Sequence, residues 1–527
     1  MKRKYIYGNS YALIVCIGVL FIFASCVSEE ITKKSDASET NLTAFVAGNP
    51  ESRTSLDYNS GDFFWEAGDK IYVQDDDGFW QESNNSPSGR TASFRFNVPG
   101  NFRNSNTYKV YYPGRNGSND QVTIPDVQTQ TTPNNTAHIG ISGDCGMADA
   151  TKSAGSTYFN FRLDHDAAIL VFQPYTASTA LQKNSYLTKI EVTSDNNITG
   201  TFTLNPTTQE MAGAGTDKHI TLNMIPTGST AKGFSLNTAS ANVTINGAYM
   251  VIKPGTHQLT VHYWIKDYGS NVEAMFTKTL PSFNYLKNNY YDMTAELEVI
   301  DYDGDHYYAW DGDGQYWKGH EWTHGNPGWQ PTLVGQVSTV EPNRDAGHGW
   351  GGVPFNGPEY PELNVMSWYI IKGDPHWDAD KLWTCMEHLY KSGMWFKKKA
   401  KIAEANHITT QEMSTKGADE IDWRTEYSGF DNKNNSIVTG APSESDINDY
   451  FFVPSLGRYD SKVLSQIGQV GYFWLRRSYP TNEFMYQYIY FNKLGVFSDI
   501  ETCGEAFGGL LTIPYSSGMI VQPSFWK

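Results

Sequence analysis

The chain has 527 residues, of which 18% are charged and 14% aromatic, and its formal net charge is −17 at pH 7. This acidity argues against nucleic acid or anionic lipid as a partner, because phosphate groups are contacted through Lys and Arg. The length exceeds that of one hydrophobic core and predicts about three domains. The aromatic content favours strands, since aromatic side chains suit a pleated, half-buried sheet.

Residues 1–25 have the pattern of a lipoprotein signal peptide. A cationic start is followed by an apolar run of about 15 residues, which is short of the roughly 20 that span a bilayer as a helix. We therefore expect cleavage before Cys26 and acylation of its thiol, with an uncleaved membrane anchor as the alternative. Ser28–Glu30 resembles the tag that sends some Gram-negative lipoproteins to the outer face of the outer membrane. Residues 26–41 are polar and aperiodic, which predicts a flexible tether.

Strands are expected to dominate from Leu42 to Val299, without helices. Apolar and polar residues alternate, so that each strand has one buried and one wet face. Antiparallel sheets of this kind pack as sandwiches, and roughly 250 residues suit two of them. We place these sandwiches at residues 42–166 and 167–300. The clearest alternating runs are Phe94–Val98, Phe159–Leu163, Thr188–Val192, Ile220–Met224, Leu259–Ile265 and Tyr291–Val299.

Four motifs in this region occur in a recognisable order. They are Arg53-Thr54 with Phe64–Val73; Val122–Pro125 with Gln128 and Gln130; Phe161–Leu170; and Tyr285–Tyr291. Together they resemble the fimbrillins, the subunits of type V pili. The resemblance implies two transthyretin-like β-sandwiches and assembly with other pilus subunits by strand exchange. It also implies cleavage after an arginine near the first strand, for which Arg53 is the candidate; the alternative is that Arg53 is an ordinary surface residue.

After Val299 the pattern changes to acidic, glycine-rich turns, many Trp and His residues and short aromatic strands. A helix is expected with Asp378 or Asp380 as its cap and Gly393 at its end, because Leu382, Cys385, Met386 and Leu389 recur at helical spacing. The runs Asp449–Gly457, Gly471–Trp474 and Met519–Pro523 then follow in order. They resemble FISUMP-type domains, which implies a C-type-lectin-like α+β domain at residues 301–527. Leu475–Arg477 departs from that pattern and puts any ligand contact there in doubt.

Exposed Trp and Tyr rings stack on sugars or anchor protein interfaces. Trp310, Trp317, Trp322 and Trp329 are therefore candidate ligand-contacting aromatics, although they could equally fill the core of a loop-rich domain.

The ionisable residues give weaker signals. Asp301, Asp303 and Asp305 resemble a calcium loop, but an EF-hand needs a bidentate acid at its twelfth position, which is Gly312 here. The default is a solvated acidic turn without metal, and the histidines have no zinc-ligand spacing. His165 and Trp65 are expected to be structural.

Cys385 and Cys503 form a possible disulfide, since the compartment would permit one. Burial as small apolar side chains is the alternative.

No motif of a serine hydrolase, zinc protease or nucleotide-binding enzyme is present, so neither an enzyme nor a cofactor is expected. The sequence favours a surface-exposed fimbrillin-like lipoprotein at a pilus tip, with the C-terminal domain as an adhesive module for a glycan or host protein. Tip placement is expected because that large domain stands where a stalk subunit would carry its donor strand. The alternative is a permanently anchored outer-membrane lipoprotein that binds such a ligand without a filament.

Overall fold

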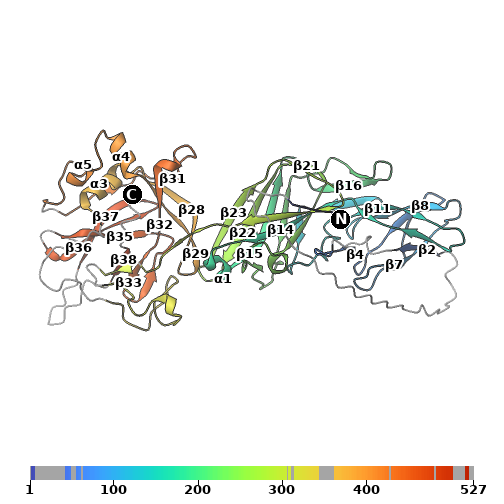
Figure 1. Cartoon of the computed structure of the whole chain (residues 1–527), viewed down its shortest axis with the longest axis horizontal. Coiled ribbons are helices and arrows are strands. Elements are labelled where there is room, and N and C mark those ends of the chain that lie inside the picture. Colours follow the sequence, from blue (N-terminus) through green and yellow to red (C-terminus); the bar gives the residue numbers. More distant parts are fainter. Residues whose placement is uncertain are drawn as a thin grey trace, which may run out of the picture. The chain divides into compact units, whose positions relative to one another are not determined.

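The structure is a computed structural model, and it forms two compact units (Figure 1). Unit 1 comprises residues 1–177, 186–265 and 275–297, and unit 2 comprises residues 178–185, 266–274 and 298–527. The residues that the structure describes are 2–5, 42–48, 55–60, 63–305, 307–309, 314–343, 361–426, 429–479, 482–502 and 517–520. Strands far outnumber helices, which confirms the prediction of a mainly β chain. No helix within these ranges is long and apolar enough to cross a membrane.

The first large sheet of unit 1 is built on an aromatic core. Trp65 is fully buried there, with its ring 4.9 Å from that of Phe96, and this confirms its structural role. The sheet has the order β6 (Trp80–Glu82), β5 (Tyr72–Gln74), β8 (Thr107–Tyr112), β11 (Gly146–Thr151), β12 (Tyr158–Phe161), β2 (Leu42–Ala47) and β7 (Phe94–Pro99), and β13 (Asp164–His165) pairs with β11.

Two further sheets of unit 1 share a second core, in which the rings of Phe172 and Tyr263 lie 6.1 Å apart. One has the order β1 (Lys2–Tyr5), β25 (Asn289–Glu296), β14 (Ala168–Tyr175) and β20 (Ala248–Ile252). The other has the order β10 (Val127–Thr129), β18 (His219–Asn223), β15 (Ser185–Ser194), β22 (Leu259–Asp267) and β23 (Val272–Thr279), with β19 (Phe234–Ser235) against β15. Smaller pairings join β9 (Gln121–Ile124), β16 (Gly200–Asn205) and β17 (Glu210–Ala212), β21 (Gly255–His257) and β24 (Phe283–Tyr285), and β3 (Ser55–Leu56) and β4 (Phe63–Phe64).

Two short helices interrupt the region between Leu42 and Val299, where none was expected. They are α1 (Thr179–Asn184) and α2 (Val243–Asn246). Each begins after a polar residue whose side-chain oxygen accepts from a backbone N–H of the first turn, Ser178 from Leu181 and Asn242 from Thr244. This N-cap geometry stabilises a turn too short to show periodicity in the sequence.

Unit 2 combines two sheets with short helices. One sheet has the order β26 (Ile300–Tyr302), β28 (His376–Cys385), β29 (His388–Lys397) and β32 (Tyr450–Pro454), with β31 (Val438–Thr439) against β28. The other has the order β30 (Lys433–Asn434), β37 (Gly495–Thr502), β36 (Asn482–Asn492), β35 (Gly471–Tyr479), β38 (Ser517–Ile520), β33 (Arg458–Asp460) and β34 (Val463–Ser465), with β27 (Tyr307–Tyr308) against β38. The helices are α3 (Leu363–Lys372), α4 (Lys399–Ala405) and α5 (Glu412–Thr415), and two 3₁₀ turns span Trp322–His324 and Ile447–Asp449. The C-type-lectin-like and FISUMP assignments stay predictions.

The helix predicted at residues 378–393 is wrong, because this segment is the hairpin of β28 and β29. Cys385 pairs with His388 across a two-residue turn. Met386 and Glu387 have φ of 49° and 66° there, and positive φ at both central residues is the mark of a tight hairpin turn. Apolar residues spaced three and four apart therefore reflect two paired strands, which are further held by β26 and β32 on either side.

Candidate functional site

Strand β2 occupies an interior position in the first sheet, although it comes first in that part of the chain. It runs antiparallel to β7, with Leu42 opposite Pro99, and parallel to β12, with Ala44 opposite Tyr158. Figure 1 shows β2 beside β7 within unit 1. We call the place between β12 and β7 the β2 position. If β2 left it, both neighbouring strands would expose unpaired N–H and C=O groups to any extended chain.

The side chains of β2 also complete the aromatic core. Phe45 has no exposed surface, and its ring stacks on that of Phe159 at 5.0 Å with an interplanar angle of 14°. The ring of Phe102 contacts the ring of Phe45 edge-on, with 5.2 Å between their centres. Ala47 is buried in the same core, and Ala44 is buried on the opposite face of the strand. The β2 position therefore accepts a strand with one large apolar side chain and small neighbours, and main-chain pairing on both edges supplies the remaining attraction.

The segment just beyond the candidate cleavage residue is tied into the second core. Thr136 donates to the carbonyl of Leu56 at 2.8 Å. Tyr58 donates to the Asp292 carboxylate at 2.8 Å and accepts at its carbonyl from Tyr290 at 3.2 Å. Arg53 itself lies outside the described residues. A cut after Arg53 would therefore leave its C-terminal side anchored while it severed the covalent link to β2.

The edge of β25 that faces away from β14 is a second place where a strand could be exchanged. Strand β1 pairs with it in parallel, from Lys2 opposite Asn289 to Tyr5 opposite Asp292, and the sequence predicts that β1 is removed with the signal peptide. Tyr290 and Tyr291 are buried on β25, and burial raises the pKa of the Tyr291 phenol. Removal of β1 would open this edge to another strand.

The opposite edge of the same sheet is closed by the two glutamines that the fimbrillin motif contains. Gln128 donates to the carbonyl of Val251 at 2.8 Å and accepts from its N–H at 2.9 Å. Gln130 accepts from Tyr249 N–H at 2.7 Å and donates to the carbonyl of Gly247 at 2.9 Å. Both side chains are buried. Two amides thus take the place of a neighbouring strand on β20.

We expect Gln130→Leu to lower the free energy of unfolding by about 1–3 kcal/mol for each backbone group left unpaired, because buried unsatisfied groups lose their solvation without compensation. Gln258 is exposed, so Gln258→Leu is the matched control and is expected to be neutral. Urea denaturation of the three proteins measures the effect. Equal stability of Gln130→Leu and the control would show that the hydrogen bonds from Gln130 to the β20 backbone do not stabilise the fold.

The candidate aromatics of unit 2 are placed differently from one another. Trp317 is 1% exposed, and its ring lies 5.3 Å from that of Tyr459, so it is a core residue and not a surface platform. Trp322 is half-buried against the same core. Trp329 is half-buried beside the imidazole of His320, at 5.0 Å. Trp310 lies outside the described residues. The structure therefore brings no exposed pair of these rings together among the residues it describes.

A different set of rings lines up across the second sheet of unit 2. The guanidinium of Arg458 lies 4.8 Å over Tyr472, which stacks on Tyr490 at 5.9 Å. Tyr490 stacks in turn on Phe497 at 5.0 Å. Each ring thus covers the face of the next, and stacking of this kind stabilises paired strands. Sequence alone missed this row because it depends on strand register.

The acidic residues form no metal centre in the part of the chain that the structure describes, where no group of three or more His, Cys, Asp or Glu side chains could hold an ion. Asp301 accepts from Thr384 at 2.7 Å, and Asp303 accepts from the N–H of Asp305 at 2.6 Å. The first bond joins the paired strands β26 and β28, and only the second is a local turn contact. The weak calcium assignment to these residues gains no support from this geometry.

His165 is a buried residue paired with an acid. Its Nδ1 lies 2.8 Å from Asp144, and both side chains are buried. The expected structural role agrees with this burial. Asp144 lies 21 residues away and meets it because Gly146 pairs with His165 across the sheet.

The cysteines carry no redox chemistry that the structure can assign. Cys145 and Cys385 are buried, and burial raises the pKa of both thiols. Cys26 and Cys503 lie outside the described residues. Acylation of Cys26 and the Cys385–Cys503 disulfide therefore stay predictions.

Comparisons with known proteins give only a partial likeness. No family model and no curated protein sequence matches the chain. Among solved structures, a Bacteroides ovatus protein described as a candidate for cell adhesion has 16% identity and a TM-score of 0.28, over 48% of this chain and 92% of its own. A fimbrial protein of Bacteroides ovatus has 12% identity and a TM-score of 0.23, over 52% and 53%. The fimbrial anchor protein Mfa2 of Porphyromonas gingivalis has 12% identity and a TM-score of 0.22, over 48% and 90%. Scores this low assign no function to this chain.

Proposed function

We propose that the protein is a non-enzymatic, fimbrillin-like surface subunit that accepts a strand from another subunit, with unit 2 as its adhesive module at the tip of a fimbrium. In this proposal Cys26 carries the lipid for transit to the outer membrane, and cleavage after Arg53 releases the subunit for assembly. The observation that carries the proposal is the placement of β2, which lies inside a sheet between β12 and β7 and precedes Arg53 in the chain.

The energetics of the β2 position suit a durable joint. Burial of a phenylalanine contributes about 1.5–3 kcal/mol, and hydrogen bonds add about 0.5–1.5 kcal/mol each. Strand β2 pairs with β7 over its whole length, from Leu42 to Ala47, and with β12 from Ala44 to Ala47. An incoming strand of similar sequence would gain the same contacts, which is the physical basis of β-strand addition.

Tip placement is supported by the course of the chain after β25. The next strand, β26, pairs in parallel with β28 inside unit 2, from Ile300 opposite Trp383 to Tyr302 opposite Cys385. The residues that follow the closing strand are thus committed to unit 2 and are not a free donor. A subunit that accepts a strand and offers none from this position fits the end of a filament.

The test is the N-terminus and the position of the protein in isolated filaments. We expect mass spectrometry to find a chain that begins at Thr54, and immunogold labelling to find one site at a filament end. A chain that begins at acylated Cys26, with label spread over the cell surface, would contradict both processing and tip placement.

That contradicting outcome would favour a second function, a permanently anchored surface lipoprotein that binds a glycan or host protein. One observation favours it, since β2 seated between β12 and β7 makes the uncut sheet complete without a partner. The same N-terminus measurement therefore separates the two functions.

A further inference from the structure

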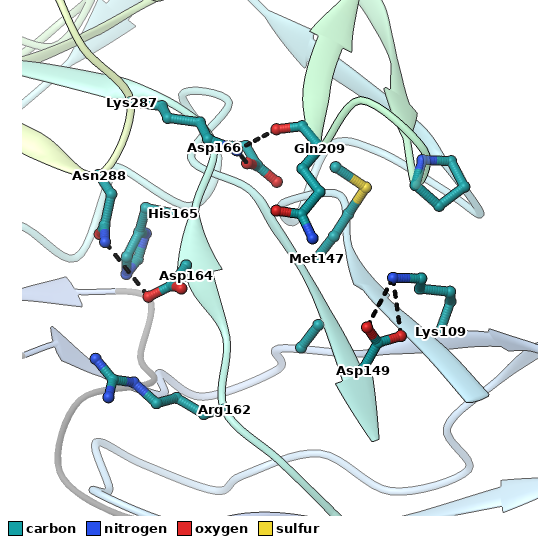
Figure 2. A pocket seen from close by; sticks show the side chains of 12 residues that line it. Lys109, Met147, Asp149, Arg162, Asp164, His165, Asp166, Gln209, Lys287 and Asn288 are labelled. Carbon is teal, nitrogen blue, oxygen red and sulfur yellow. Dashed lines mark hydrogen bonds and ion pairs between the residues drawn. The ribbon is translucent and has the colours of Figure 1, made fainter. Parts of the chain in front are cut away.

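Unit 1 contains a polar pocket that neither strand exchange nor the aromatic residues explain. Its volume is about 330 Å³, at the lower end of the range for small-molecule sites. Figure 2 shows Asp166 and Gln209 on one side, the Lys109–Asp149 pair on another, and Met147 between them. The lining comes from β8, β11, the β13 turn, the turn before β17 and the loop before β25, so five separate segments build it.

The charges around the pocket balance. Lys109, Arg162 and Lys287 face three carboxylates, those of Asp149, Asp164 and Asp166. The three carboxylates would repel an anion and the three basic side chains would repel a cation, so the pocket has no net attraction for an ion of either sign. The lining is therefore suited to an uncharged ligand.

The carboxylates of the lining each lie beside a donor. Lys109 Nζ is 2.8 Å from Asp149 Oδ1, and Lys287 Nζ donates to Asp166 Oδ1 at 2.9 Å. The wall thus offers a donor and an acceptor side by side at two places. A hydroxyl group both donates and accepts, so neighbouring hydroxyls on one ring can satisfy such a pair together. The thioether of Met147 and the ring of Pro206 add apolar surface for the C–H face of that ring.

Asp166 supplies an unused acceptor. The residue is 3% exposed, and its N–H donates to the carbonyl of Cys145 at 2.8 Å, which fixes the backbone. Its Oδ2 oxygen accepts no hydrogen bond from the described residues. Burial raises the pKa of this carboxyl even though the Lys287 ammonium opposes the shift. A buried carboxylate oxygen without a donor is costly, and a ligand hydroxyl or a water would relieve it.

We propose that this pocket binds a neutral, hydroxyl-rich molecule of the size of one or two sugar rings. No residue of β2 lines the pocket, and the proposal does not depend on strand exchange. It places saccharide recognition in unit 1, in addition to any ligand of unit 2.

The experiment is saturation-transfer NMR and calorimetry on the full chain, with glucose, galactose, mannose, N-acetylglucosamine and lactose as probes. Glycine and inorganic phosphate are the charged probes. We expect at least one sugar to bind and the charged probes not to. Lys109→Met and Asp166→Asn are each expected to weaken that binding about ten- to hundred-fold, the usual effect of one lost hydrogen bond to a charged group.

Lys189→Met is the matched control, because Lys189 is also a strand lysine in an ion pair, 2.8 Å from Glu191, and lies outside the pocket. It is expected to bind as the parent chain does. Lys109 is partly exposed, so its substitution tests the site even if Asp166→Asn unfolds unit 1. No bound sugar, binding unchanged in Lys109→Met, or binding of phosphate or glycine in place of sugar would overturn the proposal.

Discussion

A chain with Arg53→Ala is expected to keep residues 1–53 (26–53 once the signal peptide is removed) covalently attached after treatment with an arginine-specific protease, whereas the parent chain is cut and its large fragment begins at Thr54. Release of the severed segment opens the β2 position, because that segment includes the whole of Leu42–Ala47. The cut parent chain should then bind a synthetic peptide with the sequence of residues 42–47, and the uncut chain and Arg53→Ala should not. Mass spectrometry measures the N-terminus, and fluorescence anisotropy of the labelled peptide measures binding.

Two controls define this result. Arg103 is exposed in the loop between β7 and β8. Arg103→Ala therefore tests whether cleavage at another accessible arginine is what allows the peptide to bind, and we expect this variant to be cut after Arg53 and to bind the peptide as the parent chain does. A peptide in which the residue equivalent to Phe45 is Asp should fail to bind, since a charge cannot enter the contact with Phe159 unpaired. Peptide binding to the uncut chain, or none to the cut chain, would show that β2 is not an exchangeable strand.

Period-two alternation was a good guide where strands have one buried face. Phe94–Val98 coincides with β7, and Leu259–Ile265 lies within β22 with every second residue buried. These patterns arise from local geometry, because successive side chains of a strand point to opposite faces. Helical spacing, by contrast, gave a wrong helix at residues 378–393, which lie within the hairpin of β28 and β29. Two strands joined by a tight turn placed apolar residues at helical intervals, and only the pairing with β26 and β32 distinguishes the two structures.

The candidate site depended on contacts that no local pattern contains. Strand β2 lies between β12 and β7, which are more than 40 residues further along the chain, and sequence periodicity does not specify neighbours at such separations. Gln128 and Gln130 were visible as a motif, but their action on the backbone of Tyr249 and Val251 requires the second sheet. Trp317 was a candidate either for ligand contact or for core packing, and the structure places it in the core against Tyr459.

Phe45→Ala is expected to lower the free energy of unfolding by about 3–5 kcal/mol, the usual effect of truncating a fully buried phenylalanine. The substitution removes the stacked contact with Phe159 and the edge contact with Phe102, and backbone pairing on both sides of β2 limits collapse into the cavity. Thr43 is half-exposed on the same strand, so Thr43→Ala is the control, with an expected effect within about 1 kcal/mol. Chemical denaturation followed by far-UV circular dichroism gives the comparison.

The same substitution bears on assembly, because the contacts that hold β2 before cleavage resist its departure afterwards. In cut Phe45→Ala, residues 1–53 should dissociate faster than in the cut parent chain, and a peptide that keeps the phenylalanine should replace them to a greater extent. Size-exclusion chromatography after cleavage measures how much of the fragment remains bound. If Phe45→Ala and Thr43→Ala release the fragment at the same rate, the aromatic contact is not what retains β2, and main-chain pairing alone sets the lifetime of the joint.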